Sequence, residues 1–430
     1  MVNKSNIKSI KCTLCKSDKM LEIIDFGNVG LAGAFLKKKE IKSEKKYRMR
    51  LCLCRQCFLL QIHDKINPKI LFRDYFYFSS AIQTLRIHFA ELAKEVHEML
   101  KNKKSQNVLE FGCNDGILLK PLISSRINNL IGVDPASNII KTVKHKKINI
   151  INDFFNFKLS QSIRKKYGKM NVILANNVFA HISDLNNTTR AIKYLLESEG
   201  SFIFEVHYLG KMINEVQYDM VYHEHIFYHS LLSLSSHFNR YGLAIYDVKA
   251  IDIHAGSMRY YVCHNKSILS NKKTKRVTEL LNKELKNQFN KSKIFLNFSK
   301  KIQKSREDLL ALMKKIKKNN EIVYGYGASG RANTILQYCN LSRDEVPYII
   351  DDSIAKHGFY TPGSHIKICS ANILKSDEKP DYILLFAWSF LKEIVFKNKK
   401  FLELGGKIIL PLPKVKVVGL KEVKKFFLKN

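Results

Sequence analysis

The stretch Glu110-Phe-Gly-Cys-Asn-Asp-Gly116 decides how the surrounding chain folds. It overlaps the strand-like run Asn107-Val-Leu-Glu-Phe111, and its two glycines permit a tight turn into a following helix. The helical pattern at 85–100 precedes it, and further strand-like runs lie at 130–134, 148–151, 171–175 and 200–205. Because these runs alternate with helix-length segments, we predict a parallel, doubly wound α/β (Rossmann-like) sheet with helices on both faces.

Polar side chains stand at the ends of four successive strands of this predicted sheet. In open α/β sheets, ligands bind outside the carboxyl ends of the strands. The loop lacks the Gly-x-Gly-x-x-Gly pattern that cradles a diphosphate, whereas Glu110 or Asp115 can hold a positively charged amino group and Asp134 can bind ribose hydroxyls. We therefore predict S-adenosylmethionine (SAM) as the ligand of this domain. The predicted SAM-binding residues are Glu110, Gly112, Asn114, Asp115, Gly116, Asp134, Asn152, Asp153 and Asn176.

Two Cys-x-x-Cys pairs near the N-terminus predict a metal site. Cys12 with Cys15 and Cys54 with Cys57 are separated by 38 residues. Four thiolates suit a closed, tetrahedral structural zinc site, and the two-residue spacing favours Cys54 over its rival Cys52. The alternatives are four buried cysteines without metal, or a zinc knuckle that binds nucleic acid.

The composition is strongly basic, with 73 Lys and Arg against 38 Asp and Glu and a net charge of +35. The lysines are spread along the chain, which favours a solvated basic surface over a nucleic-acid groove. No apolar run reaches 18 residues, and Met1 to Lys11 lacks the apolar core of a signal peptide. We therefore expect a cytoplasmic protein without a membrane span, and we disfavour nucleic acid as its partner.

A second α/β domain is predicted in the C-terminal part. Residues 265–320 are rich in Lys and Asn with apolar residues at helical spacing, and a new strand–turn–helix signal starts at 321–325. Its loop, Gly325-x-Gly327-x-x-Gly330, opens a helix whose amides can face phosphate, although Asp351 about 20 residues on keeps a nicotinamide dinucleotide as an alternative ligand. The predicted domains are a zinc-binding module (1–72), a SAM domain (73–264), a helical connection (265–320) and a C-terminal Rossmann-like domain (321–430).

The string Tyr222-His-Glu-His225 is the candidate catalytic centre. Histidine is the side chain best suited to act as a general base near neutral pH, and a neighbouring carboxylate can orient it. The His-Glu-His spacing does not place both imidazoles on one helical face, which disfavours a zinc site on a helix. The alternative is a polar cluster packed at a domain junction.

With these motifs, the sequence resembles, over nearly its whole length, the sugar C-methyltransferases that act on nucleotide-linked keto-deoxysugars. That family has a four-cysteine zinc module before a SAM domain and a second Rossmann-like domain after it. The matching segments are the two Cys-x-x-Cys pairs, residues 74–80, 110–116, 222–225, Gly325-Tyr-Gly-Ala-Ser-Gly-Arg-Ala-Asn333, Pro362-Gly-Ser-His365 and Ala387-Trp388.

The resemblance implies a reaction and a role for each motif. A base at His225 removes a proton next to a ketone, and the resulting carbanion or enolate attacks the SAM methyl group; Tyr222, Glu224 and His181 support the base. Tyr77 lies over the sugar, with Tyr75 as the other possible match, and the C-terminal domain helps to bind the nucleotide diphosphate. The expected substrate-binding residues are Tyr75, Gly327, Ser329, Arg331, Asn333 and His365. The alternative activities are methylation of RNA, or of oxygen or nitrogen on a small molecule, by an enzyme with a zinc module.

Overall fold

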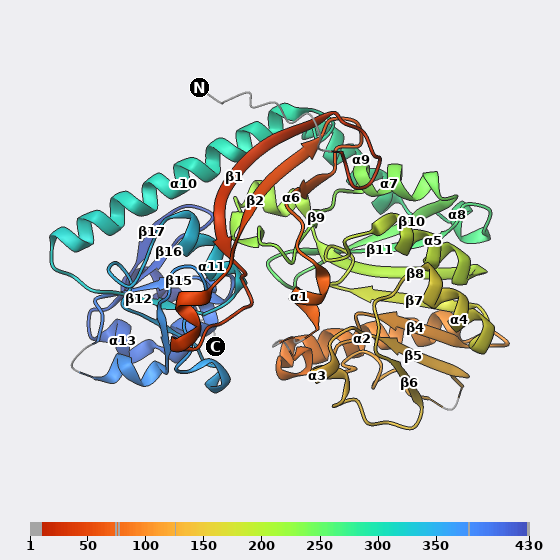
Figure 1. Ribbon diagram of the computed structural model, residues 1–430, viewed down its shortest axis with the longest axis horizontal. Helices are drawn as coiled ribbons and strands as arrows, with labels where there is room; N and C mark the ends of the chain where they lie inside the picture. The colour runs from red at the N-terminus through yellow and green to blue at the C-terminus, as the bar shows by residue number, and fades with distance from the viewer. Residues whose placement is uncertain (1–10, 74, 76–77, 125, 377–378, 428–430) are drawn as a thin grey trace.

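The chain forms three β-sheets, seen side by side in Figure 1. The structure is a computed structural model that describes residues 11–427 except 74, 76–77, 125 and 377–378. Among the described residues, none of the helices combines the length and the apolar composition needed to cross a membrane.

The central sheet confirms the five strands predicted around the first glycine loop. It contains β4 (Asn107–Phe111), β5 (Asn129–Val133), β6 (Ile148–Ile151), β7 (Met170–Asn176), β8 (Leu196–His207), β10 (Leu243–Ile251) and β11 (Ser257–His264), in the order β10-β11-β8-β7-β4-β5-β6. Strands β4 to β8 are parallel, and β11 is antiparallel to both of its neighbours. The order reverses between β4 and β7, so the ligand crevice of a doubly wound sheet is expected at Glu110 and Asn176.

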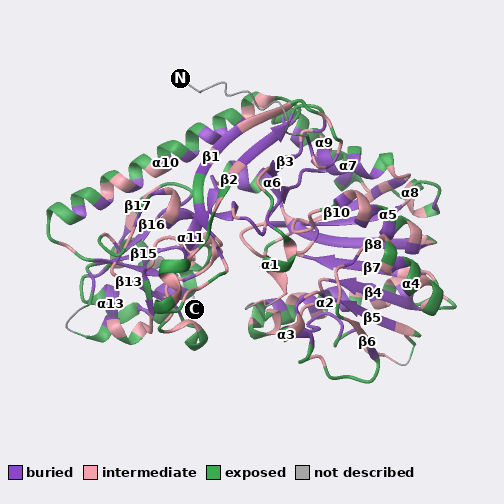
Figure 2. Cartoon of the chain, in the orientation of Figure 1, coloured by how far each residue is buried: buried purple, intermediate pink, exposed green. Residues whose placement is uncertain are grey.

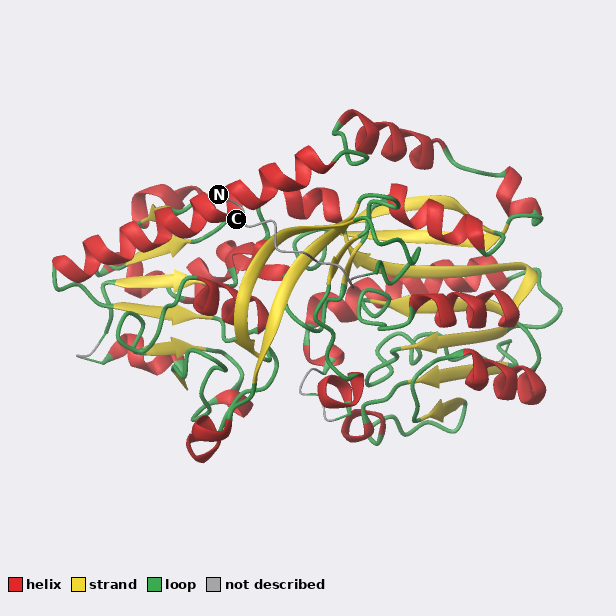
Figure 3. Cartoon of the chain, turned by 45° about the horizontal axis from the view of Figure 1, so that its top comes forward, coloured by secondary structure: helices red, strands yellow, loops and turns green. Residues whose placement is uncertain are grey.

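Helices cover both faces of this sheet (Figure 3). They are α2 (Gln83–Leu100), α3 (Ser137–Ile140), α4 (Phe157–Tyr167), α5 (Leu185–Leu195), α6 (Leu209–Asn214), α7 (Leu231–Arg240) and α8 (Ile268–Asn271). Because the faces are covered, β4 is buried at every position, including the polar Asn107 and Glu110.

The C-terminal sheet repeats the same winding with one antiparallel edge strand. It contains β12 (Val323–Tyr326), β13 (Tyr348–Ile350), β14 (Lys367–Cys369), β15 (Tyr382–Leu385), β16 (Lys407–Leu410) and β17 (Lys416–Val418), in the order β14-β13-β12-β15-β16-β17. Its helices are α11 (Gly330–Tyr338), α12 (Leu391–Lys397), α13 (Lys399–Glu403) and α14 (Leu420–Phe427). The order reverses between β12 and β15, so the second glycine loop lies at the second switch point.

Residues 11–70 form regular secondary structure around the cysteine pairs. The strands β1 (Met20–Gly30) and β2 (Lys46–Cys54) form a long antiparallel pair that lies between the two α/β domains (Figure 1). Strand β3 (Leu60–Ile62) extends this sheet, α1 (Pro68–Phe72) follows, and β9 (Phe227–Tyr228) joins β3 from far along the chain. Strand β2 is buried at every position from Leu51 to Cys54, so both of its faces are covered at the end that carries Cys54.

The segment that connects the two α/β domains consists of α9 (Lys275–Lys286) and the long α10 (Ser292–Lys318). Helix α10 runs along the C-terminal domain (Figure 1). Phe295, Phe298 and Ile302 are buried on one face of α10, as their helical spacing predicts, while the opposite face is exposed (Figure 2).

Candidate active site

The four predicted zinc ligands come together at the end of β2. One possible ligand atom from each of Cys12, Cys15, Cys54 and Cys57 lies within 4.8 Å of the others. The sulfur atoms are 3.7 Å apart in the Cys12–Cys57 pair and 3.5 Å apart in the Cys15–Cys54 pair. Gln61 Nε2 donates to Cys12 Sγ over 3.2 Å, the kind of outer contact that orients a metal ligand. Cys52 lies outside this group, as its spacing indicated. The donor set fits a structural Zn²⁺.

The first glycine loop has the close backbone packing that its glycines predicted. Gly112 has φ +70°, and a Cβ at this position would lie 2.6 Å from Val178 Cγ2. The loop is fixed to the next strand by Asp134, whose two oxygens accept the Asn114 and Ala136 amides, each over 2.8 Å. Asn152 supports this arrangement by donating to the Asp134 carbonyl over 2.9 Å. Asp153 accepts the amide of the next residue, Phe154, over 2.8 Å.

Three buried oxygens at this switch point lack a hydrogen-bond partner: Glu110 Oε2, Asp115 Oδ1 and Asn176 Oδ1. Leaving such acceptors without donors is costly. The other oxygens are engaged, since Asn176 Nδ2 donates to Glu110 Oε1 over 3.2 Å and the Ser80 amide donates to Asp115 Oδ2 over 3.1 Å. Burial raises the pKa of Glu110 to about 8, and nearby carboxylates add to the shift. These acceptors fit the amino end of a cationic cofactor such as SAM.

His225 is held in one tautomer by the backbone. Its Nδ1 lies 3.0 Å from the carbonyl oxygen of Met220, which can only accept, so Nδ1 carries the proton and Nε2 is a free base. The Tyr222 hydroxyl lies 2.8 Å from Nε2 and can donate to it. Burial lowers the pKa of His225 well below its usual value, which keeps the ring neutral. The His181 ring lies 4.9 Å away between centroids.

Glu224 faces a different set of groups from its neighbour His225. The Tyr75 hydroxyl donates to Glu224 Oε2 over 3.2 Å, and a Cβ on Gly33 would lie 2.8 Å from Oε1. Burial raises the pKa of Glu224 to about 7. The structure thus brings Tyr75 to the Tyr222–His225 string, whereas Tyr77 lies outside the described residues.

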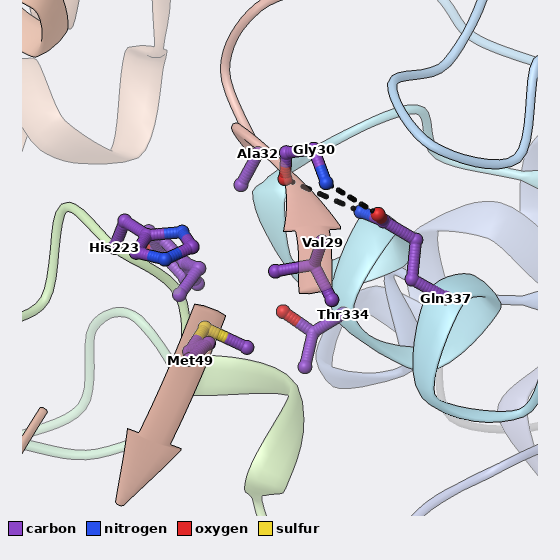
Figure 4. Close-up of a pocket in the computed structure, with 8 residues that line it drawn as sticks. Val29, Gly30, Ala32, Met49, His223, Thr334 and Gln337 are labelled. Carbon is purple, nitrogen blue, oxygen red and sulfur yellow. Dashed lines mark hydrogen bonds between the residues drawn. The ribbon is translucent and has the colours of Figure 1, made fainter. Parts of the chain in front are cut away.

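His223 points away from this site. Its Nε2 lies 3.0 Å from the Arg48 carbonyl of β2. Figure 4 shows the adjacent junction, where Gln337 of α11 pairs with both backbone groups of Gly30 over 2.7 and 3.4 Å. The cavity there is only about 10 Å³, about the space of one water molecule. It is lined by Val29, Gly30, Ala32, Met49, Tyr222, His223, Thr334 and Gln337.

Two further histidines belong to the surroundings of His225, and the sequence pattern did not single them out as catalytic. His207 ends β8, and both of its ring nitrogens are buried without a hydrogen-bond partner. His254 lies in the turn between β10 and β11 with φ +50°. Burial lowers the pKa of His207 to about 3 and that of His254 to about 4. The position of His207 at the carboxyl end of a strand could have marked it as a candidate site residue in the sequence. No sequence feature marks His254 in its turn.

The second glycine loop is also close-packed. Gly327 has φ +95°, a Cβ there would lie 3.1 Å from that of Ala387, and Ser329 caps α11 by accepting the Ala332 amide over 3.3 Å. Lys356 reaches the loop with Nζ 2.7 Å from the Ala328 carbonyl, a cation that the motif did not reveal.

The remaining predicted substrate residues of this domain contact other parts of the chain. Arg331 pairs with Asp219 over 2.6 Å. Asn333 donates to the Ala32 carbonyl over 2.6 Å, and His365 Nε2 lies 2.7 Å from Glu44 Oε2.

Comparison with known proteins assigns each part of this architecture. Family models match at residues 12–72 ("Putative zinc binding domain"), 85–248 ("Methyltransferase domain") and 252–413 ("C-methyltransferase C-terminal domain"). The C-methyltransferase NovU of Streptomyces niveus is 29% identical over 410 residues, which cover 95% of this chain and 97% of that protein. The fold and the site thus define a SAM-dependent methyltransferase with a zinc-binding module. Within that class, the chain is similar to C-methyltransferases, through the match to NovU over nearly its whole length and the match to a C-methyltransferase C-terminal domain.

Two solved methyltransferase structures are similar to less than half of the chain. The magnesium protoporphyrin IX methyltransferase ChlM from Synechocystis PCC 6803 with bound SAM is 12% identical, with a TM-score of 0.32, over 42% of this chain and 81% of that one. A SAM-dependent methyltransferase from Clostridium acetobutylicum is 15% identical, with a TM-score of 0.33, over 43% of this chain and 93% of that one.

Proposed function

We propose that the protein methylates a carbon atom of a nucleotide-diphosphate-linked keto-deoxysugar and that His225 is the base. The observation that carries this proposal is the neutral imidazole whose Nδ1–H is fixed on the Met220 carbonyl, so that Nε2 is available to take a proton. On one side His225 contacts His181, which follows β7 of the SAM domain. On the other side its partner Tyr222 lies against Gly330, where a Cβ would be 3.5 Å from the Tyr222 ring.

The choice of a ketone follows from acidity. An ordinary sugar C–H is far too weak an acid for a neutral imidazole, whereas a carbon next to a carbonyl is within reach of general base catalysis. SAM, when bound, supplies an electrophilic methyl group. His225 Nε2 takes the proton, the substrate carbon forms the new bond to the methyl group, and S-adenosylhomocysteine leaves. We assign to the Tyr222 hydroxyl, which contacts Nε2 in the free protein, the donation of a hydrogen bond to the oxygen on which negative charge develops.

The second glycine loop supports a nucleotide on the substrate. The first amides of α11 and the cation of Lys356 suit phosphate. In dinucleotide folds an acidic residue about 20 residues after the loop binds the ribose. Here Asp351 already accepts from Lys356 over 3.0 Å and from the Ser353 amide over 2.9 Å. These contacts do not distinguish the two nucleotides; the match of residues 252–413 to a C-methyltransferase C-terminal domain favours the substrate nucleotide over a nicotinamide cofactor.

Hydrogen exchange tests the proposed chemistry apart from methyl transfer. With S-adenosylhomocysteine in place of SAM, incubation of nucleoside-diphosphate keto sugars in heavy water is expected to introduce deuterium at the carbon next to the ketone. Nuclear magnetic resonance of the recovered sugar reads the position, and the same sugar with its ketone reduced to an alcohol is the control. A panel of keto sugars on different nucleotides that shows no exchange at any carbon would contradict carbanion chemistry.

The orphaned oxygens around Glu110 predict a pH-dependent affinity for the cofactor. In the free protein the pKa of Glu110 is raised to about 8, so below that pH its carboxyl is mostly protonated. If the ionised form receives the protonated amino group of SAM, affinity should rise by up to about tenfold per pH unit as pH increases towards 8, above which the amino group of SAM itself loses its proton and the rise stops. Calorimetric titration with SAM between pH 6 and 9 measures this.

Two variants make the affinity test specific. Glu110→Gln should bind SAM more weakly above pH 8 and lose most of the pH dependence, since it cannot ionise. Glu98→Gln, at an exposed carboxylate of α2, should behave as the wild type. A Glu110→Gln protein with the wild-type slope would exclude Glu110 as the titrating group.

A further inference from the structure

The segment that carries His225 is held by a helix of the other α/β domain. Tyr218 is fully buried, with its ring 5.6 Å from that of Tyr338 at the end of α11. One turn earlier in α11, Thr334 Oγ1 donates to the Val221 carbonyl over 2.8 Å. Residues 218–225 lie within the SAM domain in sequence, yet Tyr218 and Val221 contact the C-terminal domain.

The strongest of these contacts is a buried ion pair. Asp219 is completely buried, and one of its oxygens, Oδ2, accepts from Arg331 Nε over 2.7 Å and from the Trp388 indole over 2.9 Å. The guanidinium also lies 4.9 Å from the Trp388 ring centroid. Removal of one partner of such a pair leaves an uncompensated charge in the interior, so the geometry is maintained only while both are present.

Asp219 directly precedes the residue that sets the tautomer of the base. The Met220 carbonyl accepts the His225 Nδ1 proton over 3.0 Å, and the Tyr228 hydroxyl reaches the same oxygen over 3.4 Å. The 3-10 turn η3 (Tyr218–Met220) therefore links the Asp219 carboxylate to the orientation of His225 through a single peptide unit.

We propose that Arg331 and Asp219 are positioning residues for His225, and that the C-terminal domain fixes the catalytic base of the SAM domain through them. Neither side chain touches the reacting atoms in this role. The ion pair holds η3, η3 holds the Met220 carbonyl, and the carbonyl keeps Nε2 of His225 free of a proton.

The position of Arg331 also couples the base to the second switch point. Arg331 stands in the first turn of α11 after the glycine loop, and Trp388 follows β15 on the other side of that crevice. This part of the inference rests on the proposed function: a substrate nucleotide bound there would contact α11 and the segment after β15, which also hold Asp219 through Arg331 and Trp388. Substrate binding and base alignment would then depend on one set of contacts.

The test is the tautomeric state of His225, which needs no substrate. In protein labelled with ¹⁵N-histidine, long-range ¹H–¹⁵N correlation spectra are expected to show the Nδ1–H form for His225 in the wild type, with the signal assigned from the His225→Asn variant. Asp219→Asn, of nearly unchanged size, should give a mixture of the two tautomers. Asp247→Asn removes the carboxylate from a matched pair with Arg276 outside this region and should leave the His225 signal unchanged. An unaltered Nδ1–H signal in a folded Asp219→Asn protein would overturn the proposal.

Kinetics provide the second readout. A misplacement of the base by about 1 Å can lower kcat by about 100-fold. We expect this loss in Asp219→Asn with little change in the Kd for SAM, and a smaller loss in Arg331→Lys, which keeps the charge. If kcat is unchanged in Asp219→Asn, or if its loss follows thermal stability across the variants including Asp247→Asn, the positioning role is wrong. If the wild type methylates no nucleotide sugar, the proposed function fails, but the tautomer measurement still decides the positioning role.

Discussion

His225→Asn is expected to lower the rate of methyl transfer by about 10²- to 10⁴-fold, the contribution of a general base. The amide group of asparagine can still donate to the Met220 carbonyl, as Nδ1 of the histidine does over 3.0 Å, so the local backbone should be preserved. What the variant lacks is a basic atom at the position of Nε2. The measurement is kcat together with deuterium exchange in the presence of S-adenosylhomocysteine, and both should be lost while the Kd for SAM is retained.

The same string offers a matched control in His223→Gln. His223 is two residues away and is buried, but its Nε2 faces the Arg48 carbonyl of β2. Because a glutamine amide can also pair with that carbonyl, His223→Gln should keep kcat within about threefold of the wild type, as expected for a side chain outside the reaction. Equal losses in both variants, or exchange that survives in His225→Asn, would contradict the assignment of the base.

The central sheet could be predicted from the sequence because its physics is local. Its strands are mostly apolar because both faces of the sheet are covered, and polar side chains such as Glu110, Asp134 and Asn176 stand at the carboxyl edge. The Tyr222–His225 string stood out by composition alone. The composition did not show which histidine of the string belongs to the site, since His223 faces β2 and His225 faces Met220 only in the folded chain.

The parts that could not be predicted depend on contacts between distant segments. Strand β9 is two residues long and pairs with β3 across more than 160 residues of chain, so no periodicity marks it. Arg331 suggested a phosphate ligand from its place in the helix, but the structure gives it Asp219 as a partner, 112 positions earlier. Strand β2 carries Met49, Leu51 and Leu53 at alternate positions, but Cys52 and Cys54 are buried as well, so this spacing does not mark one covered face.

Cys54→Ser is expected to lose the bound zinc and to destabilise the protein by more than about 4 kcal/mol, because a structural zinc contributes its binding free energy to folding. Cys52→Ser is the matched control on the same strand. Cys52 is buried but lies outside the four-sulfur group, so this variant should keep one zinc per chain with a smaller loss of stability. Metal analysis and thermal denaturation measure both effects, and a Cys54→Ser protein with a full complement of zinc would contradict the assignment of the ligands.

The zinc variant should also reduce catalysis, although the ion takes no part in the chemistry. Gln61, which donates to Cys12 Sγ, lies in β3 opposite Phe227 of β9, and the next amide, that of Ile62, donates to the Ile226 carbonyl over 2.8 Å. These residues directly follow His225, so the metal site holds one end of the catalytic segment while α11 holds the other. Loss of zinc should therefore lower kcat in the fraction of Cys54→Ser that remains folded, with the Kd for SAM little changed because β4 and its loop lie in the other sheet. A folded, zinc-free protein with the wild-type kcat would mean that the contacts of α11 suffice to hold His225 in place.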